Sequence, residues 1–433
     1  MSEEHVIIIG NGISGITVAR HIRKLSDKKI TVISNESNYF FSRTALMYIY
    51  MGHMKFENTK PYEDWFWEKN NIELKLGSVQ SVDALSKTVC LGNDESISYD
   101  KLIIASGSKP IKIGWPGQDL IGVQGFYHLE DLHALEKNAP DNIKCKRAVI
   151  VGGGLIGIEL AEMLQSRHIP VTLLVRENSF WNTTLTDGES AMLNRHITAQ
   201  GIDLRLGVSL KEINGDNLGN VKSVTILETK EEIQCNLVAL TIGVTPNVDF
   251  LADSTIAINR GVLTNRYFET SIKDIYAIGD CAEQQLPIEN RNTIEATWYT
   301  GRIMGQTLAN TICGNKTEYN PGHWFNSAKF MDIEYQTYGI VNVQPAENHS
   351  HFYWKHEDDT MSLTFEYNKN SGEFQGINSL GIRLRHEVID RWLNEKRDLE
   401  YVLHHLNKAN FDAEFSRKYE KEIFNLYKSK VEL

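Results

Sequence analysis

The sequence predicts an α/β fold in three parts: two domains of alternating strands and helices, the second inserted in the first, and a C-terminal α+β domain. The chain has 433 residues, enough for about three domains. One strand, glycine loop and helix pattern occurs twice, and after residue 320 consecutive strands precede helices. We expect the first domain to span residues 1–113 and 245–320, the second 114–244 and the third 321–433.

The composition narrows the class of protein. Asp and Glu number 56 against 45 Lys and Arg, a net charge of -11, which argues against a nonspecific nucleic-acid binder or a protein held on acidic lipid. No segment approaches the roughly 18 apolar residues that span a bilayer, and the N-terminus lacks the basic region of a signal peptide, so we expect a cytoplasmic protein without a membrane span. The cysteines are odd in number, scattered and never in a C-x-x-C pair, which predicts reduced thiols and no metal site. They are Cys90, Cys145, Cys235, Cys281 and Cys313.

The first glycine loop follows a β-branched run at residues 6–9 and precedes a helical pattern. Its G-x-G-x-x-G motif at residues 10–15 supplies, in order, a tight turn, a close backbone approach to a pyrophosphate and close packing of helix on strand. The phosphate then lies at a helix N-terminus, where free N–H groups and the helix dipole favour negative charge. A second strand ends before Asn35 and Glu36, where an acceptor for ribose hydroxyls is expected.

The same pattern recurs at residues 148–157, where a buried strand leads into Gly-Gly-Gly-x-x-Gly and a helix that carries Glu159. Another strand follows at residues 171–175. Both modules are Rossmann-like dinucleotide-binding units. Two such units imply two dinucleotides, and the natural pair is a flavin and a nicotinamide nucleotide.

Two later segments belong to the first domain. Residues 99–110 indicate a buried strand that ends in a small-residue turn at Ser106 and Gly107. Residues 275–280 indicate another strand, and the aspartate at its end can accept a hydrogen bond from a sugar hydroxyl. The first domain is therefore discontinuous.

Together these motifs resemble the two-dinucleotide flavoprotein superfamily that holds glutathione reductase, NADH oxidase, rubredoxin reductase, the ferredoxin reductases of aromatic-ring dioxygenases and apoptosis-inducing factor. The match covers about the first 340 residues and includes a Gly-Val-Thr-Pro-Asn motif at residues 243–247. The resemblance implies that FAD lies on the first loop and on Asp280, that NAD(P)H lies on the second loop, and that hydride passes from nicotinamide to flavin. It also implies that Cys281 is a buried structural residue.

Residues 38–48 contain no cysteine, so we expect no thiol relay or active-site disulfide. The chain here resembles the rubredoxin and ferredoxin reductase branch, which carries R-P-P-L-S-K: Arg43 matches the arginine that approaches FAD, and Tyr48 stands at the lysine position. The resemblance implies that this lysine pairs with the glutamate equivalent to Glu159, beside the flavin ring. Without it, a dry site would raise the pKa of Glu159, and Tyr48 can donate a hydrogen bond instead. The expected catalytic residues are Glu159 and Tyr48.

The strand predicted for the second module ends in Val175, Arg176 and Glu177. An acidic residue at the position of Val175 would bind the 2′-hydroxyl of NADH, and Arg176 favours the 2′-phosphate of NADPH. Glu177 weakens that preference. The nucleotide is therefore NADH or NADPH.

The C-terminal third begins with residues 323–330, which resemble the W-F-W-S-D-Q-Y segment of the ferredoxin reductases but have Asn326 at the second tryptophan. The alternative is a strand of aromatic core residues. Strands and two helices are expected next, and a last apolar stripe suits packing on the domain itself or on a second subunit better than docking to a membrane. The stripe comprises Phe415, Tyr419, Ile423 and Tyr427, and the nearby histidines His349, His351 and His356 match no metal-ligand spacing. A basic group, Arg383, Arg385, His386 and Arg391, faces either an acidic iron-sulfur protein or solvent.

We therefore expect an FAD-dependent NAD(P)H oxidoreductase that passes electrons to a small ferredoxin-type or rubredoxin-type carrier protein, with a homodimer as a candidate assembly. An NAD(P)H:quinone reductase or oxidase, and a redox-sensing flavoprotein with mainly a binding role, are the alternatives. The residues expected to hold the two cofactors are Gly10, Gly12, Ser14, Gly15, Asn35, Glu36, Arg43, Val79, Ser106, Gly107, Gly152, Gly154, Leu155, Ile156, Gly157, Glu159, Arg176, Gly243, Gly279, Asp280 and Trp298.

Overall fold

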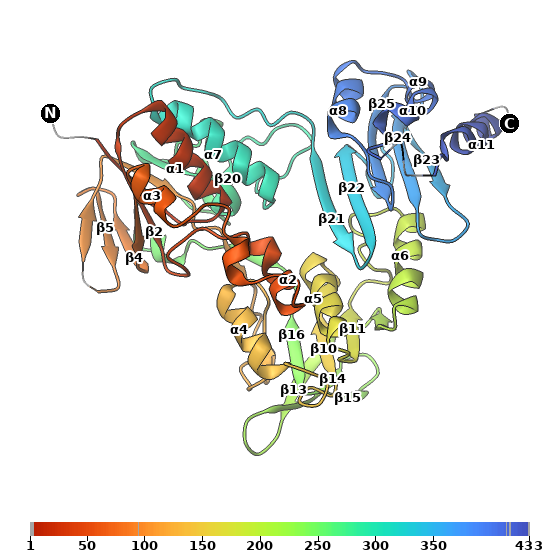
Figure 1. The fold of residues 1–433 in the computed structure, drawn as a ribbon, viewed down its shortest axis with the longest axis horizontal. Helices are drawn as coiled ribbons and strands as arrows, with labels where there is room; N and C mark the ends of the chain where they lie inside the picture. Colours follow the sequence, from red (N-terminus) through yellow and green to blue (C-terminus); the bar gives the residue numbers. More distant parts are fainter. Residues whose placement is uncertain (1–3, 94, 413, 415–416, 432–433) are drawn as a thin grey trace. The chain divides into compact units, whose positions relative to one another are not determined.

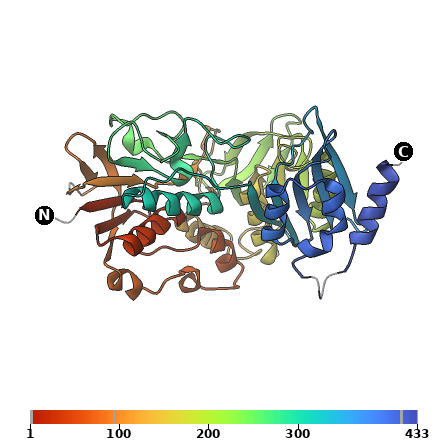
Figure 2. The same ribbon diagram turned by 90° about the horizontal axis from the view of Figure 1, so that it is seen from above.

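The computed structural model describes residues 4–93, 95–412, 414 and 417–431, which fall into two compact units (Figure 1, Figure 2). The first unit comprises Met1–Lys112, Tyr127–His133 and Gly243–Pro321. The second comprises Ile113–Phe126, Ala134–Ile242 and Gly322–Leu433. Each unit contains a parallel sheet with crossover helices, so the predicted α/β class is confirmed.

The first unit is built on a five-stranded parallel sheet in the order β19-β7-β1-β2-β3. Its central strand is apolar and buried after His5, as expected for a parallel sheet that is covered on both faces. Val6 and Ile8 pack with the buried residues of α1 and α7, whereas Ile7 and Ile9 join a second core cluster. The strands are β1 (His5–Ile9), β2 (Lys29–Ser34), β3 (Ile72–Leu76), β7 (Lys101–Ile104) and β19 (Ile275–Ala277).

Helices α1 (Ile13–Leu25) and α7 (Trp298–Ile312) lie side by side, although they are far apart in the sequence (Figure 1). Their backbones approach closely because α7 has glycine where they meet: a Cβ at Gly305 would lie 2.8 Å from the carbonyl oxygen of Ser14. Two further α-helices of this unit are α2 (Leu46–Tyr50) and α3 (Trp65–Lys69), and the first half of α4 (Leu129–Asn138) also belongs to it.

Short strands complete the first unit. A meander of three strands follows β3. The chain leaves the unit after β8, returns briefly at Tyr127–His133 and re-enters it for good before β17, which pairs antiparallel with β8. These strands are β4 (Val79–Asp83), β5 (Thr88–Leu91), β6 (Ser96–Ser98), β8 (Ser108–Pro110), β17 (Val244–Pro246), β18 (Val262–Thr264) and β20 (Ala282–Gln284).

The second unit contains another five-stranded parallel sheet, in the order β12-β11-β10-β16-β9, with α5 (Leu155–Ser166) packed on β10 and β11. Helix α6 (Asp187–Ala199) begins with a capping box between Thr186 and Glu189. The sheet strands are β9 (Val123–Gln124), β10 (Ala148–Val151), β11 (Val171–Val175), β12 (Asp203–Leu206) and β16 (Leu237–Leu240). A three-stranded sheet comprises β13 (Leu210–Gly215), β14 (Val221–Ile226) and β15 (Glu232–Gln234).

The C-terminal segment of this unit folds as the predicted α+β domain. Its antiparallel sheet has the order β21-β22-β25-β24-β23, and residues 325–330 form the first strand. The strands are β21 (Phe325–Phe330), β22 (Ile333–Gly339), β23 (His349–Lys355), β24 (Ser362–Asn368) and β25 (Phe374–Leu380). The helices are α8 (His386–Asn394), α9 (Leu399–His404), α10 (Leu406–Ala409) and α11 (Glu420–Val431).

The last apolar stripe packs on this same domain. Ile423 is 1% exposed, and Tyr419 and Tyr427 contact the C-terminal core cluster, while Phe415 lies outside the described residues. In the described chain, no helix combines the length and the apolar character needed to cross a bilayer. These contacts show that the described residues of the stripe belong to the core of the C-terminal domain.

Candidate functional site

The first glycine loop is tightly packed at Gly10 and Gly15 but open at Gly12, where the helix begins. Gly10 has a φ of +109°, and a Cβ there would lie 2.1 Å from the carbonyl oxygen of Ala105. A Cβ at Gly15 would lie 2.0 Å from the carbonyl oxygen of Gly10. A Cβ at Gly12 meets nothing within 4 Å. The open space lies at the N-terminus of α1, which no side chain caps, and this fits a phosphate group.

Glu36 and Arg43, both expected near FAD, contact each other. Arg43 donates from its two terminal nitrogens to the Glu36 carboxylate at 2.9 and 2.5 Å. The carboxylate also accepts from the N–H of Leu129 at 2.8 Å, and Arg43 also donates to the carbonyl oxygen of Tyr127. Most of the roughly four acceptor positions of Glu36 are therefore used within the protein.

The charge of Glu36 follows from these contacts. Burial alone would raise its pKa, but hydrogen bonds from His128 and Arg43 outweigh burial and lower the pKa to about 2. The loop at residues 127–129 supplies His128 and the N–H of Leu129. Sequence analysis missed this loop because it is short, irregular and about 90 residues along the chain from Glu36.

Asp280 lies after β19, where the sheet ends. Burial raises its pKa, and the hydroxyl of Ser108 donates to its carboxylate at 3.2 Å. Ser106 donates to the carbonyl oxygen of Asn247 and so fixes the turn after β7. The remaining acceptor positions of Asp280 suit a sugar hydroxyl.

Ser14 lies among glycines at the start of α1. A Cβ at Gly279 or at Gly301 would lie 2.5 Å from the Ser14 hydroxyl oxygen. Sequence analysis included Gly279 but missed Gly301 and Gly305, although their G-x-x-x-G spacing on a helix was a usable signal.

Cys281 is fully buried beside Asp280. Its thiol lies within hydrogen-bond distance of the carbonyl oxygens of Ile104 and Ile278, and burial raises its pKa. The thiol therefore remains protonated and packs in the core, as a structural cysteine does.

Four other predicted residues of the first unit lie on separate elements. Asn35 is exposed after β2, and Val79 begins β4. Tyr48 lies on α2 with its ring stacked 6.1 Å from that of His53. Trp298 begins α7, is 39% exposed and has the Arg302 guanidinium 5.7 Å from its ring centroid.

The second glycine loop repeats the geometry of the first. A Cβ at Gly152, whose φ is +119°, would lie 2.5 Å from the carbonyl oxygen of Thr241, and one at Gly157 would lie 2.3 Å from that of Gly152. A Cβ at Gly154 finds its nearest atom 3.9 Å away, so this loop is also open in front of its helix. Leu155 and Ile156 form the first turn of α5. Thr241, which sequence analysis missed, follows β16 as Ala105 follows β7.

The end of β11 carries the charges expected to select the nucleotide. Val175 is buried, whereas the Arg176 side chain is 81% exposed. Its guanidinium donates to the Glu177 carboxylate at 2.8 Å. Glu177 therefore competes with any phosphate for Arg176.

Glu159 lies in the second turn of α5 and, among the described residues, forms no ion pair with a lysine. Burial and the negative charge of Glu162 raise the pKa of Glu159 to about 7, against an opposing effect of Lys329. The sequence predicted a raised pKa for Glu159, and its surroundings in the structure agree with that prediction.

The histidines of β23 contact a carboxylate. His349 and His351 lie 2.7 and 3.2 Å from the oxygens of Glu366, which is fully buried. His356 instead pairs with Asp358. Within the described residues, no group of three or more His, Cys, Asp and Glu side chains is arranged to hold a metal ion.

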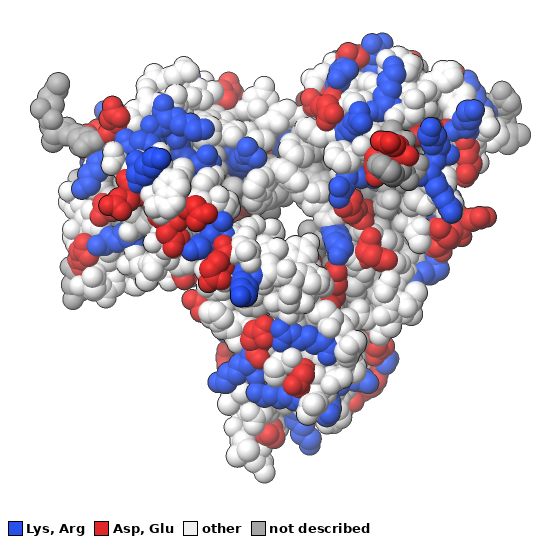
Figure 3. Space-filling view, viewed as in Figure 1, with Lys and Arg blue, Asp and Glu red and all other residues white. Residues whose placement is uncertain are grey.

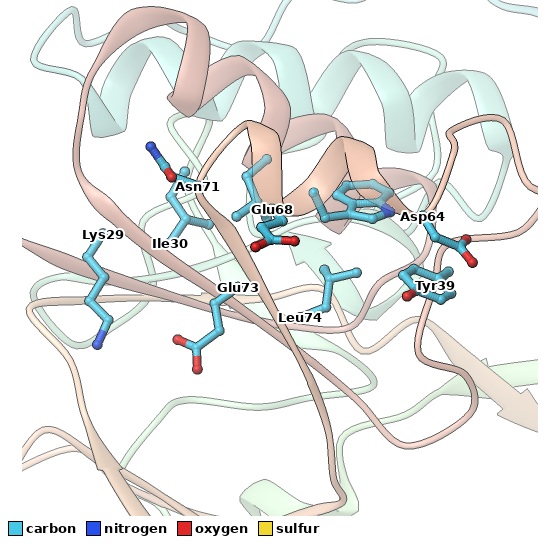
Figure 4. Close-up of a pocket in the computed structure, with 10 residues that line it drawn as sticks. Lys29, Ile30, Tyr39, Asp64, Glu68, Asn71, Glu73 and Leu74 are labelled. Carbon is cyan, nitrogen blue, oxygen red and sulfur yellow. The ribbon is translucent and has the colours of Figure 1, made fainter.

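A cavity of about 480 Å³ lies between β3 and α3 in the first unit (Figure 4). Lys29 and Ile30 line it at the amino end of β2, whereas the first glycine loop follows the carboxyl end of β1. Glu68 and Glu73 stand beside it in Figure 4. The cavity therefore lies at the other end of the sheet from the first glycine loop and has an acidic lining, so it is a different site from the dinucleotide loop.

Two glycine-loop modules, each open in front of an uncapped helix N-terminus, define a protein that binds two dinucleotides. The chain belongs to the pyridine nucleotide-disulphide oxidoreductase family, whose sequence pattern matches residues 4–304. The open loops fit FAD and NAD(P)H, the cofactors expected for this family.

Curated relatives agree with this family, and solved structures share the fold. The chain is 30% identical over 291 residues to a nitrite reductase [NAD(P)H] of Bacillus subtilis, covering 66% of this chain but only 35% of that relative. It is 27% identical over 333 residues to a rubredoxin-NAD(+) reductase of Ectopseudomonas oleovorans, covering 76% and 85%. A ferredoxin reductase from Rhodopseudomonas palustris has a similar fold, with a TM-score of 0.79, 22% identity and coverage of 88% and 91%.

Proposed function

We propose that this chain is an NAD(P)H-dependent reductase of a small iron-sulfur carrier protein of ferredoxin or rubredoxin type. The observation that carries the proposal is the pair of open glycine loops combined with a buried, protonated Cys281 and no cysteine at residues 38–48. Rubredoxin and ferredoxin stand in the names of two similar proteins, which supports the choice of acceptor.

In this proposal the first loop, Ser14, Ser106, Gly107, Gly243 and Asp280 hold FAD, and the second loop, Glu159 and Arg176 hold the nucleotide. FAD held by these residues would supply the redox chemistry that links hydride from NAD(P)H to electron transfer. Asp280 accepts a hydrogen bond from a sugar hydroxyl, and each loop offers backbone N–H groups to a pyrophosphate. The Glu36–Arg43 pair has a mainly structural role, because the two charges already satisfy each other.

No thiol takes part in the proposed electron path. Cysteine chemistry requires a thiolate, and burial of Cys281 opposes thiolate formation. In this proposal, electrons therefore pass from the flavin to the acceptor without a thiol intermediate.

Positive charge in the first unit suits an acidic carrier. Lysine and arginine side chains gather over α1 (Figure 3). Burial, together with the charges of Lys24, Arg20 and Arg302, lowers the pKa of His21. Opposite charges of this kind guide two proteins together, even though the chain as a whole is acidic. A cytoplasmic location and a homodimer remain predictions from the sequence.

The test is anaerobic stopped-flow reduction of the FAD-loaded protein by NADH and by NADPH, followed by mixing with ferredoxin, rubredoxin, a quinone or oxygen. We expect one nucleotide to bleach the flavin absorbance rapidly and an iron-sulfur carrier to restore it fastest. Faster reoxidation by quinone or oxygen would contradict the proposal in favour of a quinone reductase or oxidase. Slow bleaching by both nucleotides would favour the redox-sensing role.

A further inference from the structure

A lysine and two glutamates form a cluster on α5. Lys329 of β21 donates to the Glu162 carboxylate at 2.7 Å, and β21 packs on α5. Glu159 and Glu162 are three residues apart, so they lie on the same side of the helix. The C-terminal sheet therefore supplies a cation to the helix that begins at the second glycine loop.

The Glu162 carboxylate depends on this lysine. Its side chain is 16% exposed, and its second oxygen, Oε2, is buried with no hydrogen-bond partner within the described structure. A buried carboxylate with one unsatisfied oxygen is costly, and the Lys329 ammonium is the charge that offsets the cost.

Two charged side chains of this unit, Glu162 and Lys329, act on Glu159. Strands β10 and β11, which pack on α5, consist of uncharged residues, and β21 contributes Lys329. Glu162 is the carboxylate on the same helix that acts on Glu159. The ionisation of Glu159 is therefore governed by burial and by these two opposite charges.

We propose that Lys329 is a positioning residue of the nicotinamide site, which acts on Glu159 through its ion pair with Glu162. The inference rests on the proposed binding of NAD(P)H at the second glycine loop, which ends two residues before Glu159. The nicotinamide ring is neutral in NAD(P)H and positively charged in NAD(P)⁺. An ionised Glu159 stabilises the oxidised nucleotide, whereas a protonated Glu159 does not.

This proposal predicts a distinctive pH dependence. Because the pKa of Glu159 is raised to about 7, the affinity for NAD(P)⁺ should rise as the pH increases through 7, while the affinity for NAD(P)H should change little. Lys329→Met removes a cation and should move the midpoint to higher pH. Glu162→Gln removes an anion and should move it to lower pH. Purely structural damage would not produce opposite shifts.

The experiment measures NAD⁺ and NADP⁺ dissociation constants of the FAD-loaded protein between about pH 5.5 and 8.5 by calorimetry. At pH 7 we expect Lys329→Met to bind the oxidised nucleotide about threefold more weakly and Glu162→Gln up to about twofold more tightly. Lys329→Arg should resemble wild type. Glu159→Gln should remove the pH dependence, which assigns the titrating group. The matched control is Lys355→Met, which removes another ion-paired lysine from the same sheet.

The outcomes separate the two proposals. Unchanged midpoints, or midpoints that move in the same direction, would overturn the role of Lys329. Retention of the pH dependence in Glu159→Gln would overturn it as well. Failure of wild type to bind either nucleotide would instead contradict the proposed function on which the inference rests. Lys329 is 39% exposed, so folded variants are expected, and Glu162→Gln tests the same cluster independently.

Discussion

The ion pair of Glu36 and Arg43 shows how unequally two charged partners can be buried. The Glu36 side chain is 10% exposed and that of Arg43 34%. The glutamate has the smaller exposed fraction, but desolvation opposes the charge of both side chains, so each depends on its hydrogen bonds for stability. A carboxylate held in this way makes folding sensitive to acid.

Glu36→Gln should lower the free energy of unfolding by about 3 kcal/mol at pH 7. The pKa falls from 4.5 to about 2 on folding, and each unit corresponds to about 1.4 kcal/mol. Since the folded-state pKa is lowered, this stabilisation is present above about pH 4.5 and is lost as the pH falls towards about 2.

Urea unfolding of wild type and Glu36→Gln at pH 7 and pH 3 measures this difference. Glu57→Gln, at an exposed position, is the control and should change stability by less than about 0.5 kcal/mol. A difference between wild type and Glu36→Gln that is equally large at both pH values would contradict the prediction.

Side chains differ in how far the sequence reveals their surroundings. The sequence indicated that Glu159 would have a raised pKa, because a lysine was missing nearby. It did not indicate Lys329, which is 167 residues from Glu162. The partners of Glu36 at residues 127–129 were equally hidden, because neither contact leaves a local pattern.

At the scale of elements, the glycine loops were predictable because each is a local device. A strand, a turn and a helix N-terminus are set by neighbouring residues, so their spacing appears directly in the sequence. The packing of α1 on α7 depends on glycines almost 300 residues away, and their spacing was the only local sign of it.

The two glycines of the first loop should respond differently to alanine. Gly15→Ala places a Cβ 2.0 Å from the carbonyl oxygen of Gly10, so backbone must shift and stability should fall by about 2 kcal/mol or more. Gly12→Ala meets nothing within 4 Å, so the protein should fold with little change. Its methyl group would nevertheless occupy the space proposed for the FAD pyrophosphate.

Thermal unfolding and the amount of FAD that copurifies distinguish these effects. Gly12→Ala should keep its unfolding midpoint without FAD but lose at least half of its bound flavin, whereas Gly15→Ala should lose both. Full flavin occupancy in Gly12→Ala would be inconsistent with a pyrophosphate at this loop. Gly52→Ala, at another glycine with open space, is a control for backbone strain: its φ of +78° should cost about 1 kcal/mol of stability while the amount of bound flavin stays unchanged.

At the scale of the whole molecule, the second unit joins a nucleotide module to the C-terminal sheet. Glu189 of α6 is fully buried and accepts hydrogen bonds from Thr364 at 2.7 Å and Asn378 at 3.2 Å. It also accepts from Thr186 at the start of its own helix. Aromatic rings extend this interface, with Phe180 and Trp181 packed edge-on against Phe330.

Glu189→Ala should lower the free energy of unfolding of the second unit by about 3 kcal/mol, because it leaves several buried donors without an acceptor. Glu189→Gln, which keeps one acceptor oxygen, should cost less. Asp187→Ala, at an exposed position in the same first turn, should cost no more than about 1 kcal/mol.

Hydrogen exchange followed by mass spectrometry checks this prediction. Faster exchange in α6 and β24 of Glu189→Ala, with unchanged exchange in β1, is the expected pattern. Equal stability of the alanine variant and wild type would show that the carboxylate has no coupling role.

The interface around Glu189 also determines how this chain can be recombined with others. A chimera that exchanges only the residues after 321 would leave Glu189 facing a foreign sheet without the Thr364 and Asn378 donors. Gly188 adds a steric condition, since a Cβ there would lie 2.8 Å from the Tyr353 ring. A chimera that preserves these contacts must therefore exchange the start of α6 together with the C-terminal sheet.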